Sequence, residues 1–206
     1  LAEYDNKIVG NFGDVSCISF YPSKNLGALG DAGCIISNSY KIINNARKFA
    51  NYGSTDFKSV NHSVVGINSR MDEIQASFLL SKIKYLRKLT NERIKLAKIY
   101  DLFCKKLNII NIKVLDNSIN VYHIYPILLK NRNIIKSKLE KRGIYAQIHY
   151  EIPIHLQKSF KHLKYHVGDL PVTERLSKNI LSLPFYPGIS KKKINYLFKT
   201  LQNLIK

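Results

Sequence analysis

The chain has 206 residues, of which 45% are apolar, so it can bury the core of one large domain or two small ones. Its net charge of +19 comes mostly from lysines scattered along the chain, a pattern that disfavours a dedicated nucleic-acid surface. No run approaches the roughly 18 apolar residues that cross a bilayer, and LAEYDNKIVG at the start lacks a secretory pattern, so we expect a cytoplasmic protein with neither membrane nor nucleic-acid partner.

Two short apolar segments in the first quarter of the chain predict strands, at 15–20 (VSCISF) and 33–37 (GCIIS). We expect the first to be buried. The loop between them contains three glycines that permit tight backbone turns. Ser39 suits the N-cap of a helix that runs to about residue 50 and is stopped by Gly53, and the polar segment 54–69 reads as a long loop.

The remaining chain predicts two helices, or one long bent helix, followed by alternating strands and helices. Ser69–Asp72 resembles a capping box, and apolar residues recur at helical spacing from there to about residue 107. This helical segment would join two domains, 1–107 and 108–206. The second is expected to be a small α+β domain with strands at 121–129 and 144–150 and helices at 131–142, 170–179 and 191–204.

Neither the cysteines nor the histidines predict a metal site. Cys17, Cys34 and Cys104 have no zinc-ligand spacing and form no even-numbered disulfide set, so we expect buried apolar groups. His162 and His166 are four residues apart and could share a helix face, but no third ligand is nearby in the sequence.

Lys24 stands out among the lysines because of its position. It follows a predicted strand and Pro22, and it precedes the glycines of the loop. The loop at a strand end is where an α/β fold usually holds its ligand. A partly dry pocket there disfavours the ammonium form, which leaves an amine able to attack an aldehyde and form a Schiff base. The default alternative is a solvated surface charge.

The segment SFYPSKNLGALGDAG (19–33) resembles the lysine segment of the DegT/StrS family of sugar aminotransferases, pyridoxal-phosphate enzymes of the aspartate-aminotransferase fold (fold type I). The resemblance implies an α/β fold, with part of the large cofactor-binding domain and its central sheet over 1–107 and the small domain over 108–206. It continues in order through VGNFGD (9–14), NYGS (51–54), GINSRMDEIQAS (66–77), NERIKLAKIYD (91–101), GIYAQIHYEIPIHLQ (143–157) and LPVTERLSKNILSLPFYPGI (170–189).

The resemblance also implies roles for four residues of the first domain. Lys24 would form the Schiff base with pyridoxal 5'-phosphate, and Ser19 would hydrogen-bond the cofactor phosphate. Asn68 would reach the phosphate in the partner subunit, which implies a homodimer with shared active sites. Arg70 would steady that loop or face the substrate. Without the resemblance, Ser19 reads as satisfied by backbone, Asn68 as a turn residue or helix cap, and Arg70 as a surface charge.

His149, Tyr150 and His155 match a block that lies at the edge of the family's active site, where they would contact the sugar-nucleotide substrate. Packing at a domain interface is the alternative. The implied reaction transfers an amino group, usually from glutamate, to a keto-deoxy sugar linked to a nucleoside diphosphate, for surface polysaccharides. Relatives that are dehydratases carry histidine at the position of Lys24, so lysine here favours transamination.

Family members have a longer N-terminal half that carries the acid facing the pyridine nitrogen. We therefore expect a truncated chain that is inactive and poorly soluble alone. The alternative from another functional class is a non-catalytic basic protein that binds nucleic acid, or a gene remnant.

Overall fold

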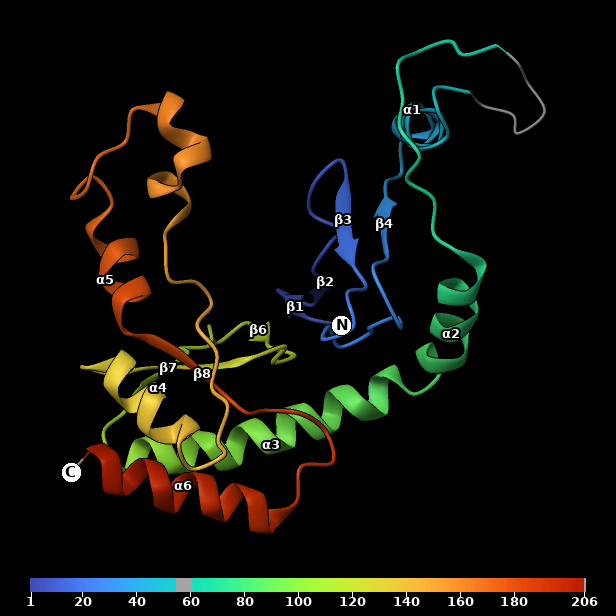
Figure 1. The fold of residues 1–206 in the computed structure, drawn as a ribbon. Coiled ribbons are helices and arrows are strands. Elements are labelled where there is room, and N and C mark those ends of the chain that lie inside the picture. The colour runs from blue at the N-terminus through green and yellow to red at the C-terminus, as the bar shows by residue number, and fades with distance from the viewer. Residues whose placement is uncertain (55–60, 206) are drawn as a thin grey trace. The chain divides into compact units, whose positions relative to one another are not determined.

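The computed structural model of the protein describes residues 1–54 and 61–205, which form two compact units (Figure 1). Unit 1 comprises Leu1–Asn91 with Leu115–Val121, and unit 2 comprises Glu92–Val114 and the chain from Tyr122 onward. The change between units falls inside helix α3 (Leu86–Lys106) and not at 107/108, because α3 contributes Ala97 and Tyr100 to the core of unit 2. The functional division into domains 1–107 and 108–206 stays a prediction.

The described residues of unit 1 form two small antiparallel sheets, helices α1 and α2, and the start of α3. Strand β3 (Ser16–Ser19) pairs with β4 (Gly33–Ile36), and the second sheet has the order β2-β1-β6. Its strands are β1 (Glu3–Tyr4), β2 (Lys7–Ile8) and β6 (Ser118–Ile119). Helix α1 (Tyr40–Ala50) begins as predicted, since the Ser39 hydroxyl accepts the backbone N–H of Ile42 at 3.4 Å.

Residues 16–19 form the predicted strand, but the prediction that this strand is buried is wrong. Among the described residues, β3 pairs only with β4, and the faces of this two-stranded sheet leave Cys17 and Ile18 exposed and Cys34 half-buried. The expected burial of all three cysteines therefore holds only for Cys104 in unit 2. A sheet of two strands cannot cover its own apolar faces, which explains the difference.

Helix α2 (Glu73–Ile83) starts later than the predicted capping box at Ser69, and its N-cap is Asp72. The reason is a competing extended pairing, in which the Ser69 N–H donates to the Ala50 carbonyl at 2.9 Å and Asn68 forms a β-bridge with Asn51. Part of the loop expected at 54–69, residues 55–60, lies outside the described residues.

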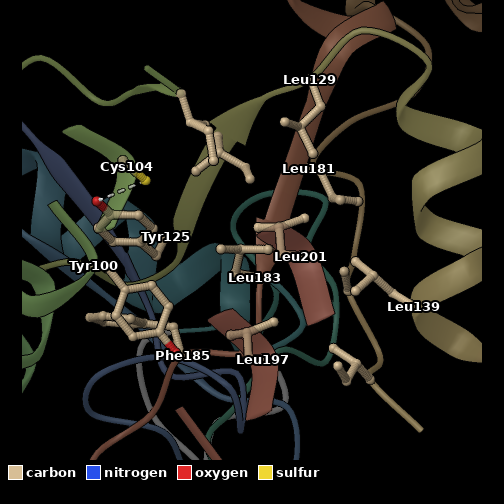
Figure 2. Packing of buried hydrophobic residues seen from close by; sticks show 14 of the residues in the cluster. Tyr100, Cys104, Tyr125, Leu129, Leu139, Leu181, Leu183, Phe185, Leu197 and Leu201 are labelled. Atoms are coloured by element: carbon tan, nitrogen blue, oxygen red, sulfur yellow. Dashed lines mark hydrogen bonds between the residues drawn. The ribbon is translucent and has the colours of Figure 1, made fainter. Parts of the chain in front are cut away.

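Unit 2 packs helices against an antiparallel sheet of order β5-β7-β8. The strands are β5 (Ile110–Asn111), β7 (Tyr125–Leu128) and β8 (Ile180–Leu183), and the helices are most of α3, α4 (Arg132–Glu140), α5 (Pro171–Asn179) and α6 (Lys191–Ile205). Leu139 of α4, Leu181 of β8 and Leu201 of α6 meet in a core where each is fully buried (Figure 2). The α+β character expected of this region is confirmed.

Two predicted strands of unit 2 differ in the structure. The strand expected at 121–129 shortens to β7, and residues 144–150 form no strand. Gln147 makes an isolated bridge with Ser182, and their backbone N–H groups donate reciprocally at 3.0 and 2.7 Å. The chain then enters the short 3-10 helices η1 (Ile154–Leu156) and η2 (Lys158–Leu163). Within residues 1–54 and 61–205, the helices lack the combined length and apolar character needed to cross a membrane.

Candidate active site

Lys24 lies in a loop of unit 1 that its own backbone closes. The Phe20 N–H donates to the Ala32 carbonyl at 2.8 Å, and the Ala28 N–H donates back to the Phe20 carbonyl at 2.7 Å. Inside this closure, the Lys24 N–H donates to the Tyr21 carbonyl at 2.8 Å. The lysine thereby lies in the loop that follows the carboxyl end of β3, and it is half-buried; its covalent role stays a prediction.

Two glycines of this loop are dictated by close backbone approach. A Cβ on Gly27 would overlap the carbonyl oxygen of Pro22, and a Cβ on Gly33 would lie 2.9 Å from the carbonyl oxygen of Ile18. Only glycine allows the chain to turn this tightly after Lys24 and to pair this closely with β3. The glycines therefore shape the loop, as the sequence predicted.

Ser19 ends β3 and is exposed, with its hydroxyl accepting the Tyr21 N–H at 3.3 Å. It lines a hollow of about 900 Å³ over β3, β4 and α1, together with Arg47 and Arg70. Lys24 and Asn68 are not among the lining residues. The structure thus brings Ser19 together with two cationic side chains around a space large enough for a cofactor-sized ligand.

Asn68 and Arg70 form one exposed cluster. The Arg70 Nε donates to the Asn68 side-chain oxygen at 3.1 Å, and the guanidinium lies over the Tyr52 ring, 5.7 Å from its centroid. This contact is compatible with the steadying role expected for Arg70, which stays a prediction.

The three predicted substrate residues lie in unit 2 and differ in accessibility. The His149 Nδ1 and the Ser182 hydroxyl oxygen are 2.9 Å apart, whereas Tyr150 is 74% exposed. His155 is buried, with its Nε2 3.2 Å from a carboxylate oxygen of Glu174. In this structure the accessible member is Tyr150, and His155 packs internally; their substrate roles stay predictions.

Glu174 organises the segment around His155. Its carboxylate accepts the backbone N–H of Gly168 at 2.9 and 3.0 Å and that of Leu170 at 3.3 Å. These donors, first the Gly168 N–H, lower the pKa of Glu174 below its ordinary value. The sequence analysis missed Glu174 because its partners are backbone groups and a histidine 19 residues away.

His162 and His166, weighed above as a helical pair, do not share a helix. His162 lies in η2 and His166 lies beyond its end, where its backbone N–H donates to Asp169 at 2.7 Å. In the parts of the chain that the structure describes, no three His, Cys, Asp or Glu side chains cluster closely enough to hold a metal ion.

The residues at the end of β3 suit pyridoxal phosphate by their chemistry. Lys24 offers an amine for the aldehyde, and Ser19 offers a hydroxyl for the phosphate. The cations of Arg47 and Arg70 line the same hollow as Ser19 and outnumber the one carboxylate among its described lining residues, that of Asp31, which leaves a net positive lining for a phosphate dianion. These residue types suit the two ends of this cofactor, although Lys24 does not line the hollow that Ser19 and the two arginines line.

Known proteins match this chain over nearly its whole length. The model of the DegT/DnrJ/EryC1/StrS aminotransferase family matches residues 1–202. A "pleiotropic regulatory protein" of Geobacillus stearothermophilus is 34% identical, covering 97% of this chain and 54% of that protein. A UDP-N-acetyl-3-dehydro-alpha-D-glucosamine 3-aminotransferase of Acidithiobacillus ferrooxidans is 35% identical, covering 94% and 51%.

Among solved structures, a DegT/DnrJ/EryC1/StrS aminotransferase from Brucella abortus superposes with a TM-score of 0.90 at 32% identity, covering 99% of this chain and 54% of that one. The fold is therefore part of an aminotransferase fold. The chain spans about half the length of the proteins that it matches.

Proposed function

Because the chain belongs to the DegT/DnrJ/EryC1/StrS aminotransferase family, we propose that it serves in the pyridoxal-phosphate-dependent transfer of an amino group to a nucleotide-linked keto sugar. The observation that carries the proposal is the half-buried Lys24 in its closed loop, five residues after Ser19. The Acidithiobacillus relative, whose name specifies amination of a UDP-linked sugar, supports the substrate class. Aminotransferases of this family depend on pyridoxal phosphate.

The chain's own residues would have distinct tasks in this reaction. When bound, pyridoxal phosphate supplies an electron sink for the carbon that gains or loses the amino group. Lys24 would hold the cofactor covalently through Nζ and, once an amino donor replaces it, would take and return a proton at the substrate carbon. Ser19 would donate its hydroxyl proton to a phosphate oxygen.

The finer features of the proposal follow the resemblance. Glutamate is the proposed donor, a keto-deoxy sugar destined for surface polysaccharide is the proposed acceptor, and the compartment is the cytoplasm. Asn68 would contact the phosphate bound to a second copy of the chain, steadied there by Arg70. Tyr150, the most exposed of the three unit 2 residues, would stack on the substrate.

The proposal includes a need for further polypeptide. The matched relatives are about twice as long, and the β3–β4 sheet leaves apolar side chains such as Ile18 and Ile35 exposed. We therefore propose that the 206 residues by themselves do not transaminate, and that amino transfer requires additional chain to cover this sheet and to complete the site.

The test is covalent labelling of protein produced from its natural gene. After incubation with pyridoxal phosphate and borohydride reduction, we expect a pyridoxyl mass on the peptide containing Lys24. The label should disappear in Lys24→Arg and persist in Lys41→Arg, which removes an exposed lysine of α1. Label spread over many lysines, or salt-sensitive DNA binding with no label at Lys24, would favour the non-catalytic basic protein instead.

A further inference from the structure

The loop that carries Lys24 is held from outside by one face of helix α2. Gln75, Leu79 and Lys82 are spaced i, i+4 and i+7, so they share a face of the helix. Leu79 is the buried residue of α2, and it lies between two polar residues that both contact the lysine loop. On this helix face, polar Gln75 and Lys82 can hydrogen-bond the loop backbone while Leu79 between them is buried.

Gln75 makes the closer of the two polar contacts. Its side-chain oxygen accepts the Leu29 N–H at 2.9 Å and the Gly30 N–H at 3.0 Å. One carbonyl oxygen has two lone pairs, so a single side chain satisfies two successive backbone donors of the loop. A Cβ on Gly30 would lie 3.1 Å from the Gln75 side-chain nitrogen, so glycine there gives the amide room to approach.

Lys82 fixes the same loop two turns further along the helix. Its ammonium donates to the Gly27 carbonyl at 3.0 Å, and it lies 5.6 Å from the centroid of the Phe78 ring. The loop is therefore held at 27 by Lys82 and at 29 and 30 by Gln75, while its own backbone closes it around Lys24. Gln75 thus restrains residues 29 and 30, which follow the Ala28 N–H that closes the loop on Phe20.

We propose that Gln75 is a positioning residue for Lys24, an inference that rests on the proposed function. By accepting the two loop N–H groups, it keeps the turn after Lys24 in one conformation, so that the lysine amine is presented at a fixed place for the cofactor aldehyde. Pre-organisation of this kind lowers the ordering cost of binding. Gln75 itself does not touch the reacting atoms.

The test compares three substitutions in protein produced from the natural gene. Gln75→Leu removes the acceptor and leaves a shorter, apolar side chain, Gln75→Glu keeps the shape and an acceptor, and Ser77→Ala changes an exposed residue of the same helix. The readout is the pyridoxal phosphate concentration that half-labels Lys24 on borohydride reduction, measured beside the urea midpoint of unfolding. We expect Gln75→Leu to raise that concentration on the order of tenfold, and Gln75→Glu and Ser77→Ala to leave it within about threefold.

Equal labelling of Gln75→Leu and wild type would overturn the inference, as would a Gln75→Glu variant as impaired as Gln75→Leu. If Gln75→Leu fails to fold, Gly30→Ala disturbs the same contact from the loop side and should raise the half-labelling concentration without moving the urea midpoint as far. Absence of label at Lys24 in the wild type would instead overturn the proposed function, so the two failures are distinct.

Discussion

Replacing Gly27 by alanine tests whether the Lys24 loop depends on close backbone contact. The added Cβ would lie 2.7 Å from the Pro22 carbonyl carbon and 2.9 Å from the Tyr21 carbonyl oxygen, and it would overlap the Pro22 oxygen itself. Ordinary contact begins at 3.4 Å, so the Pro22 carbonyl carbon must retreat by at least 0.7 Å, the difference between 3.4 and 2.7 Å. Backbone cannot give way as the end of a flexible side chain can.

The expected cost follows from what that displacement breaks. The Lys24 N–H bond to Tyr21 and the Ala28 N–H bond to Phe20, at 2.8 and 2.7 Å, flank the shifted carbonyl. Losing both costs about 2 kcal/mol at about 1 kcal/mol each, and overpacking adds about 1–3 kcal/mol. We therefore expect Gly27→Ala to destabilise the loop by about 3–5 kcal/mol.

Hydrogen exchange measured by mass spectrometry reports on this loop, and urea unfolding reports on the whole chain. Gly13→Ala is the matched control, because the nearest atom to its added Cβ is 3.9 Å away and its cost should stay within about 0.5 kcal/mol. We expect Gly27→Ala to accelerate exchange of the Lys24 and Ala28 amides while Gly13→Ala leaves it unchanged. Unchanged protection of both amides in Gly27→Ala would refute the reasoning.

Three further predictions concern burial and charge. In the isolated 206-residue chain, Ile35→Thr should cost under about 0.5 kcal/mol by urea unfolding, because Ile35 is 46% exposed, whereas Ile127→Thr, at 1% exposed, should cost about 2–3 kcal/mol. Equal costs in that chain would contradict an uncovered β4. Because the pKa of Glu174 is lowered in the folded protein, its carboxylate contributes stability above pH 4.5, and this contribution is lost as the pH falls through the folded pKa. The stability advantage of wild type over Glu174→Gln should therefore shrink on acidification. A difference in stability that does not change with pH would argue against this role of the carboxylate. Iodoacetamide at pH 8 should alkylate exposed Cys17 and spare Cys104 until unfolding, because burial raises the Cys104 pKa to about 11; rapid loss of both thiols would be inconsistent with the core of unit 2.

Features encoded by neighbouring residues could be predicted from the sequence. The Ser39 cap, helix α1, helix α6 and the glycine turns after Lys24 each depend on residues a few positions apart, and the structure contains all of them. The resemblance to the family supplied the fold, which no local pattern indicated. The side chains of Lys24 and Ser19 could be placed at the end of β3 because strand and loop are contiguous.

Features that depend on distant partners could not be predicted. The ILSL segment that forms β8 follows helix α5 directly, with no turn residue to mark its start, and it becomes a strand because β7 pairs with it. Residues 144–150 have a strand-like composition, but their backbone pairing with β8 is the isolated bridge at Gln147. Gln75 reads as an ordinary helical residue, since the loop donors that define its role lie 45 and 46 positions away.

The placement of Lys24 and the exposure of the β3–β4 sheet therefore have separate causes. Ile18 and Ile35 of the β3–β4 sheet are exposed in the part of the chain that the structure describes, yet Lys24 is half-buried because its loop closes on itself and α2 packs beside it. A polar substitution at Ile35 should leave the loop unchanged, whereas changes at Gly27 or Gln75 act on it directly. The shape of the lysine loop is thus set by residues 20–32 and by α2, independently of the exposed faces of the sheet.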